Sequence, residues 1–227
     1  MAHDIDVDRV AAAFGAHAGL AARIFTALGQ DPAGTDGSHD MSHVLRVWRN
    51  VETIAHTEPD CDLPVLVAAV ILHDCVAVEK NSPLRAEASR LSAARASEIV
   101  DGFGWSHARI AALRHVIEAH SYSSGIVPQT LDARVLRDAD RLDALGAVGI
   151  ARCFYVAGRM ASALYDPEDA NARYRALDDR RYALDHFKAK LFPEAEGFLT
   201  EAGRAMAAER AAVMRAFVAA FHREVEA

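Results

Sequence analysis

Apolar residues recur at helical spacing along most of the chain. Alanine, leucine and arginine are abundant, whereas the strict alternation of apolar and polar residues that is typical of strands is almost absent. Segments rich in Gly, Pro, Ser and Asp, such as DPAGTDGS at 31–38 and SSGIVPQT at 123–130, separate the apolar patterns. The pattern predicts an all-α protein with helices over residues 7–29, 39–57, 63–76, 85–100, 106–120, 131–160, 170–190 and 196–226.

The breaks between these helices are too short to be interdomain linkers, and the sequence contains no internal repeat. A chain of 227 residues is long enough to bury a sizeable core. We therefore expect a single globular helical bundle, in which residues 1–35 form an N-terminal helical extension packed on the body and residues 36–227 form the main domain. The alanine-rich C-terminal helix is compatible with a homodimer.

Composition narrows the classes of partner. The net charge of −7 provides no global basic field for nucleic acid or for an anionic membrane. The three cysteines are odd in number and widely spaced, which fits neither a disulfide framework nor a CxxC zinc site and indicates a reducing compartment. No apolar stretch approaches the roughly 20 residues that cross a bilayer, and the N-terminus does not resemble an export signal. We expect a cytoplasmic protein that binds neither membranes nor nucleic acid.

Two stretches place metal-competent side chains where an ordinary helix would not need them. GTDGSHDMSHVLRVW, residues 34–48, puts His39, Asp40 and His43 at the mouth of a helix, where Ser38 or Asp40 could also serve simply as a cap. In AAVILHDC, residues 68–75, an apolar run leads into His73 and Asp74. Burying these two without partners costs several kcal/mol. Either a hydrogen-bonded His–Asp pair or a shared metal ion would compensate them.

A third stretch, ARVLRDADRLDALGAVGIAR at 133–152, brings carboxylates onto an apolar helix. Asp140 and Asp143 share a stripe with Leu136 and Ala147 at helical spacing. A solvated face is the ordinary explanation for such charges, but the surrounding apolar residues leave this helix little surface that could face solvent.

In chain order these stretches supply His43, then His73 and Asp74, then Asp140, and this order resembles the HD-domain superfamily of metal-dependent phosphohydrolases. The superfamily pattern is H…HD…D on a helical bundle. Further segments resemble one bacterial branch, which includes nucleoside triphosphate pyrophosphohydrolases, and the likeness runs from about residue 36 to the end. These segments are HDxxHxxRV (39–47), KNSPLRAEAS (80–89), AHSYSSG (119–125), DADRLDALGAVGIAR (138–152) and HFKAKLF (186–192).

The resemblance implies that residues 36–227 form an HD-type phosphohydrolase domain with one divalent metal ion. Its ligands would be His43, His73, Asp74 and Asp140. A mixed nitrogen and oxygen set suits Mn²⁺ first, with Mg²⁺, Fe²⁺, Co²⁺ or Ni²⁺ as alternatives. A second metal ion is not expected, although some branches place extra histidines between the HD pair and the last aspartate.

Further side chains are candidates for catalysis and substrate binding. The catalytic set is Asp74, Glu79 and Lys80, in which Glu79 is either a general base or an exposed loop acid. Lys80 and Arg46 are candidates to clamp phosphates, with Arg141 as a weaker one and His120 as a contact to phosphate or base. Asp40 would cap the helix or support His43, the role of His39 stays open, and we expect His115 to be structural.

The function that this reading predicts is hydrolysis of a nucleotide, most simply of a (d)NTP to (d)NMP and pyrophosphate through a metal-activated water. A nucleotidase or a cyclic-nucleotide phosphodiesterase would use the same ligands. A non-catalytic nucleotide sensor is the alternative outside enzymes.

Overall fold

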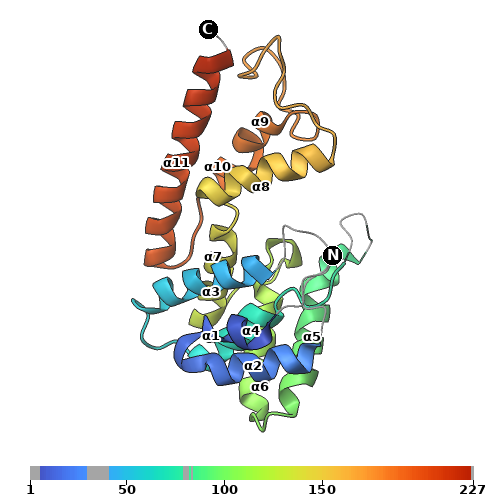
Figure 1. Cartoon of the computed structure of the whole chain (residues 1–227), viewed down its shortest axis with the longest axis vertical. Coiled ribbons are helices and arrows are strands. Elements are labelled where there is room, and N and C mark those ends of the chain that lie inside the picture. Colours follow the sequence, from blue (N-terminus) through green and yellow to red (C-terminus); the bar gives the residue numbers. More distant parts are fainter. Residues whose placement is uncertain (1–5, 30–40, 79–81, 83, 226–227) are drawn as a thin grey trace. The chain divides into compact units, whose positions relative to one another are not determined.

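The computed structural model describes residues 6–29, 41–78, 82 and 84–225, and the regular elements within these ranges are helices (Figure 1). The one β-type pairing among them is an isolated bridge between Ala163 and Tyr182. The predicted all-α class is therefore confirmed. The chain divides into two compact units, Met1–Asp140 and Arg141–Ala227, which are described separately below as the first and the second unit.

The first unit is built around one wholly apolar helix. α4 has the sequence LPVLVAAVIL, and every residue from Val65 to Leu72 is buried. A helix that is apolar on all sides has to be surrounded, and α2, α3, α5 and α6 all contact it. The helices of this unit are α1 (Val7–Ala12), α2 (Ala18–Leu28), α3 (Met41–Ala55), α4 (Leu63–Leu72), α5 (Ala88–Asp101), α6 (His107–His120) and α7 (Leu131–Leu142), whose last two residues belong to the second unit.

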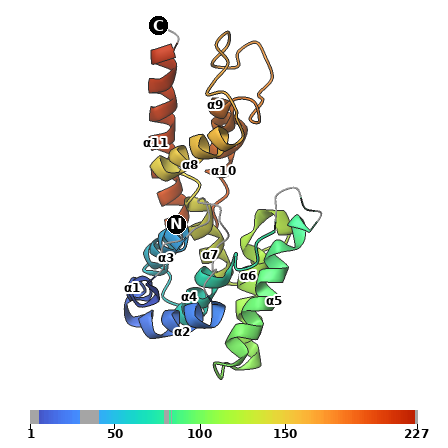
Figure 2. The ribbon, with the colours of Figure 1, turned by 45° about the vertical axis from the view of Figure 1, so that its right-hand side comes forward.

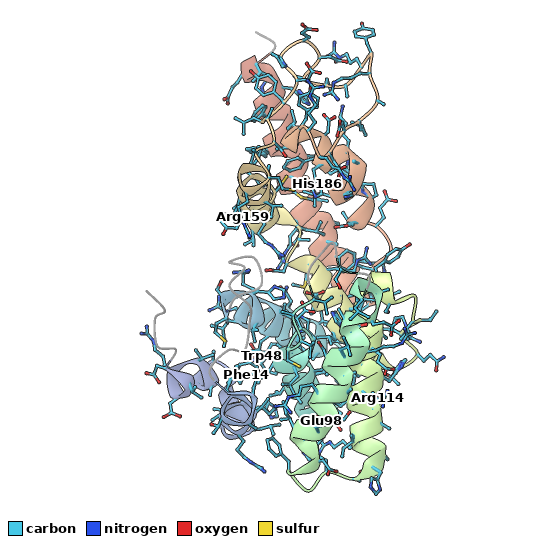
Figure 3. The ribbon with its side chains drawn as sticks, turned by 90° about the vertical axis from the view of Figure 1, so that its right-hand side faces the viewer. Phe14, Trp48, Glu98, Arg114, Arg159 and His186 are labelled. Carbon is cyan, nitrogen blue, oxygen red and sulfur yellow. The ribbon has the colours of Figure 1, made fainter. Side chains whose placement is uncertain are left out.

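Two further contacts complete the first unit. The N-terminal helices are anchored by Phe14, which is 1% exposed and stacks on Trp48 of α3 with ring centroids 4.9 Å apart (Figure 3). α5 and α6 lie side by side as an antiparallel hairpin (Figure 2), and Ser106 caps α6 by accepting a hydrogen bond from the backbone N–H of Arg109.

The second unit packs α8 against the long C-terminal helix α11. Its core is aromatic. Three rings lie with their centroids 5.8 to 6.1 Å apart, those of Phe154 in α8, Phe187 at the start of the π-helical turn and Phe217 in α11. The elements are α8 (Gly146–Arg159), α9 (Ala183–His186), a π-helical turn (Phe187–Leu191), α10 (Phe192–Glu194) and α11 (Glu201–Val225).

The predicted helix over 170–190 is wrong for most of its length, because residues 170–181 form turns, bends and irregular chain and Tyr182 lies in the isolated bridge. Asp169 accepts hydrogen bonds from the backbone N–H groups of Arg173 and Tyr174, and Arg175 pairs with Asp185 at 2.5 Å. Aspartate side chains that bond to nearby backbone offer the chain an alternative to the helix. This local hydrogen bonding outweighed the helical propensity of the segment.

The predicted helix over 131–160 is also wrong in its continuity, since α7 ends at Leu142 and α8 begins at Gly146. Gly146, the first residue of α8, has φ of +71°, a left-handed conformation that a continuous α-helix does not contain. Asp143 falls in this break, where it is 1% exposed and pairs with Arg152 at 2.6 Å. The stripe that the sequence assigned to Asp140 and Asp143 together is thus divided.

Other predicted helices are present with shifted ends. A short 3₁₀ turn at Gly15–His17 interrupts the predicted helix over 7–29. The helix predicted over 63–76 ends at Leu72, and the helix predicted over 196–226 begins only at Glu201. Within the part of the chain that the structure describes, no helix is long and apolar enough to span a bilayer.

Candidate metal centre

Two polar residues, His73 and Asp74, follow the C-terminal end of the buried helix α4. Its N-terminus is capped by Asp62, which accepts a hydrogen bond from the backbone N–H of Val65 at 3.2 Å. His73 is the C-cap residue, and Asp74 follows it. Because His73 is 1% exposed and the Asp74 side chain is 44% exposed, the pair lies where the core meets solvent.

α3 and α7 bring the other two predicted ligands. His43 lies in the first turn of α3 and is buried, and Asp140 lies in the last turn of α7 with its side chain 26% exposed. Seven residues after His43, the buried Asn50 donates a hydrogen bond to the carbonyl of Ala139 at 2.8 Å. A carbonyl in the last turn of a helix has no intrahelical partner, so Asn50 fills that role and ties α3 to α7 beside Asp140.

Three of the predicted ligands meet in one group. The Nε2 atoms of His43 and His73 are 3.3 Å apart. Asp140 Oδ1 lies 3.4 Å from His43 Nε2 and 3.8 Å from His73 Nε2. Each residue offers one ligand atom, and all three atoms lie within 4.8 Å of one another.

A second group shares His73 and adds a histidine from α6. Asp74 Oδ2 lies 3.7 Å from His73 Nε2, and Asp74 Oδ1 lies 3.5 Å from His120 Nε2. The rings of His73 and His120 meet edge to face with centroids 5.0 Å apart. The structure therefore brings together His43, His73, Asp74, Asp140 and His120, the last of which the sequence assigned to substrate.

Backbone carbonyls orient two of the imidazoles. His73 Nδ1 lies 2.9 Å from the carbonyl oxygen of Val70, and His120 Nδ1 lies 2.6 Å from that of Ile117. A carbonyl oxygen can only accept, so in both rings Nδ1 carries a proton and donates it. The Nε2 atoms are left to face the group, which is how a second hydrogen bond usually fixes a ligand histidine.

The two histidines of α4 and α6 differ in their affinity for a second proton. Burial lowers the pKa of His73, and the nearby charges of Asp74 and Asp140 do not offset it. Burial also acts to lower the pKa of His120, but the hydrogen bond and the charge of Asp74 outweigh burial and raise it. His73 is therefore the neutral imidazole whose Nε2 lone pair points into the group.

The arrangement is compatible with a divalent metal ion. The neutral His73 aims a lone pair at His43 Nε2, and the carboxylates of Asp74 and Asp140 direct further lone pairs to the same region. Acceptors that converge in a buried place need a cation or protons to be stable. Imidazole and carboxylate together suit Mn²⁺, Fe²⁺ or Co²⁺, and the partial exposure of both carboxylates leaves room for water and substrate.

Other predicted site residues are placed less directly. Arg46 follows His43 on α3 by nearly one turn, and its guanidinium donates a hydrogen bond to Ser42 Oγ at 2.9 Å. Glu79 and Lys80 lie outside the described residues, as do His39 and Asp40. Their predicted roles stay predictions.

Arg141 has contacts that the sequence did not predict. Its guanidinium donates hydrogen bonds to the backbone carbonyls of Glu194, Glu196 and Gly197 at 2.7 to 3.0 Å, and lies 4.7 Å from the ring centroid of Phe198. These contacts hold the turn after α10 in the second unit and give Arg141 a structural role. Its predicted contact with substrate gains no support from them.

His115 and Asn50 show what sequence reasoning could and could not find. His115 Nε2 accepts a hydrogen bond from the backbone N–H of Gln129 at 3.1 Å, in agreement with a structural role. Asn50 escaped notice, although its spacing of seven residues from His43 puts both on one face of a helix. A polar residue on the apolar stripe was the available signal.

The fold and the order of the site residues define a class of protein. Residues 41–145 match the family model of the HD domain, and this range contains His43, His73, Asp74, His120 and Asp140. Residues 41–145 therefore match the HD domain, as the sequence motifs predicted.

Among proteins of known sequence, the chain is similar to the uncharacterized protein YpgQ of Bacillus subtilis. The two are 29% identical over 191 residues, which cover 82% of this chain and 84% of YpgQ. The crystal structure of YpgQ in complex with ADP is 26% identical, with a TM-score of 0.67, and the match covers 96% of this chain and 98% of that chain.

Two further solved structures are similar. A protein of Lactobacillus plantarum is 29% identical with a TM-score of 0.66, over 91% of this chain and 96% of its own. An HD-superfamily hydrolase of Bacillus thuringiensis is 22% identical with a TM-score of 0.68, over 96% of this chain and 97% of its own, and this likeness concerns the fold.

Proposed function

We propose that the protein is a metal-dependent phosphohydrolase that converts a (d)NTP to a (d)NMP and pyrophosphate. The observation that carries the proposal is the convergence of His43, His73 and Asp140 ligand atoms within 4.8 Å, beside the more exposed Asp74. The ADP bound to YpgQ supports a nucleotide as the ligand class. The resemblance of several motifs to the pyrophosphohydrolase branch supports the reaction.

The residues divide into ligands and substrate contacts. His43, His73, Asp74 and Asp140 would hold one divalent ion, with Mn²⁺ as our first choice. Such an ion supplies Lewis acidity toward a phosphoryl oxygen and lowers the pKa of water. The carbonyl of Val70 keeps the proton of His73 on Nδ1, so that Nε2 stays available as a ligand atom.

Cationic groups beside the ligands would bind the polyphosphate. Arg46 lies on α3 close to His43, and Lys80 follows the HD pair along the chain. His120 holds a proton on Nδ1, and its Nε2 faces Asp74, which raises the pKa of this imidazole and favours the cation. In our proposal His120 contacts phosphate or base, the role that its position at the end of α6 suggests.

Product analysis tests the proposal. Metal-stripped protein receives Mn²⁺ and a panel of NTPs and dNTPs, and pyrophosphate and orthophosphate are measured separately. The variant His73→Ala/Asp74→Ala should lose turnover. The matched variant Asp101→Ala/His107→Ala removes the same two residue types from exposed positions of the α5–α6 hairpin and should retain it. Replacing Mn²⁺ by Mg²⁺, Fe²⁺, Co²⁺ or Ni²⁺ in the same assay identifies the preferred ion.

The products discriminate between the candidate reactions. Pyrophosphate together with monophosphate, lost only in the site variant, supports the proposal. Orthophosphate alone would replace it with a nucleotidase, and turnover restricted to cyclic nucleotides with a phosphodiesterase. Bound metal and bound nucleotide without any turnover would favour a sensor.

A further inference from the structure

Tyr122 is a large aromatic side chain that the first unit leaves in solvent. It is 82% exposed, although it lies only two residues after His120, the buried last residue of α6. Its backbone is nevertheless ordered by a 3₁₀ turn, Tyr122–Ser124, in which the N–H of Gly125 donates to the carbonyl of Tyr122 and Ser124 Oγ donates to that of Ser121. An ordered turn thus presents an aromatic ring that contributes little to the core.

A cation supports one face of this ring. The guanidinium carbon of Arg137 lies 5.5 Å from the ring centroid of Tyr122, within the range of a cation–π contact. Arg137 also donates a hydrogen bond to the carbonyl of Ile126 at 3.4 Å, so the guanidinium is held by the same loop that carries the ring. With Arg137 on one side, the exposed fraction of the ring leaves the other side for a ligand.

The pair lies close to the metal centre along both chain segments. Tyr122 is two residues from His120, a separation of at most about 7 Å along an extended chain. Arg137 is three residues from Asp140 on α7, a rise of about 4.5 Å along the helix. On α7, Arg137 and Asp140 are both partly exposed, whereas Asp138 and Ala139 between them are fully buried. Arg137 and Asp140 therefore lie on the same, solvent-facing side of the helix.

We propose that Tyr122, supported by Arg137, is the surface on which the base of the nucleotide stacks. The inference rests on the proposed nucleotide chemistry of the metal centre and adds the part of the substrate that the metal does not touch. Phosphates bind at the ligands, and the base reaches the ring at the edge of the same site. Stacking depends on the π-face and not on a hydrogen-bond pattern. The site therefore accepts all bases and binds purines, which have the larger face, more tightly than pyrimidines.

Substitutions at position 122 separate base binding from phosphate binding. The dissociation constants of ADP and of inorganic tripolyphosphate are measured by calorimetry with Mn²⁺ present, and KM values of dATP and dCTP by product release. Tyr122→Ala should weaken ADP and raise the KM of dATP by on the order of tenfold, with a smaller effect on dCTP and none on tripolyphosphate. Tyr122→Phe keeps the ring and should behave as the parent protein. Val127→Ala, which trims another exposed side chain of the same loop, is the matched control.

The outcomes distinguish this inference from the proposed function. Equal weakening of ADP and tripolyphosphate by Tyr122→Ala would overturn the inference, because the ring would then act on phosphates or metal. Unchanged ADP binding and an unchanged KM would also overturn it, while turnover by the parent protein would leave the proposed function intact. If Tyr122→Ala selectively loses ADP binding but the parent protein hydrolyses no nucleotide, the base surface is supported and the proposed hydrolase function is refuted.

Discussion

The Nε2 atoms of His43 and His73 face each other at 3.3 Å inside the first unit, with each residue at most 2% exposed. The Nδ1 proton of His73 is committed to the carbonyl of Val70, so its Nε2 is a lone pair in the neutral ring. Two facing nitrogens can share one proton or one cation. With Asp140 Oδ1 at 3.4 Å from His43 Nε2, a shared cation satisfies all three groups at once.

This geometry predicts that Mn²⁺ stabilises the protein. A ligand that binds only the folded state adds about 2.7 kcal/mol of stability at a concentration one hundred times its dissociation constant. Asp140→Asn removes the charge of a proposed ligand and should abolish most of this gain, whereas Asp101→Asn at an exposed position should retain it. Thermal unfolding with and without Mn²⁺, together with metal content after dialysis, measures both effects. An equal shift of the melting temperature in both variants would argue against Asp140 as a ligand.

Asn50 should support both stability and the metal centre. Asn50→Ala removes the hydrogen bond to the carbonyl of Ala139 and leaves a buried acceptor unpaired, at a cost of about 1 to 2 kcal/mol in the free energy of unfolding. We expect weaker Mn²⁺ binding as well, because the contact fixes α3 beside Asp140. Thr53→Ala, which trims an exposed side chain bonded within its own helix, is the control. If metal affinity survives in Asn50→Ala while stability falls, Asn50 serves packing alone.

Two of the three glycines of α8, Gly149 and Gly158, should respond oppositely to substitution by alanine. A Cβ at Gly149 would lie 2.1 Å from the carbonyl oxygen of Ala144, whereas a Cβ at Gly158 meets nothing within 4 Å. Gly149→Ala should therefore lower the free energy of unfolding by about 3 kcal/mol or more. Gly158→Ala should be neutral or stabilise by up to about 1 kcal/mol, because alanine favours the helix. Urea denaturation of the two variants decides the matter, and equal effects would contradict this account of the close approach.

The stability difference between the parent protein and an Asp132 variant should depend on pH. Burial raises the pKa of its carboxyl group, and although the N–H of Asp62 donates a hydrogen bond to it, the charge of Asp62 raises the pKa further. Since the folded pKa lies above the ordinary value of 3.8, the contribution of this group is fully present below 3.8 and is lost as pH rises through the folded pKa.

Asp132→Asn keeps an acceptor oxygen and removes the buried charge. The variant should therefore gain stability over the parent protein at pH 7, by less than about 1 kcal/mol, and the gain should vanish toward pH 4. Unfolding by urea at both pH values gives the difference directly, with the exposed Asp60→Asn as control. A variant that loses stability at pH 7 would indicate that the carboxylate charge itself is needed there.

Prediction from the sequence succeeded where one strong local signal dominated. The unbroken apolar run of α4 identified a buried helix, and the two polar residues at its end identified the HD pair. It failed over 170–182, where Asp169 and Arg175 form local hydrogen bonds and ion pairs that no hydrophobic periodicity reports. It also joined α7 to α8, because the turn over residues 143–145 and the left-handed Gly146 interrupt the helix without interrupting the apolar pattern.

The sequence by itself determined the helical class, the apolar centre of the first unit and the order of His43, His73, Asp74 and Asp140, because residue type and spacing are local properties. Only the tertiary structure decided which atoms meet. It set the 3.3 Å between two Nε2 atoms and brought His120 to 3.5 Å from Asp74. It also directed the guanidinium of Arg141 to the backbone carbonyl of Glu194 in the second unit and placed Arg137 over the ring of Tyr122. These relationships join residues that lie between 15 and 53 positions apart, counting from 122 to 137 and from 141 to 194. Packing of whole helices fixes such distances, and no local pattern encodes them.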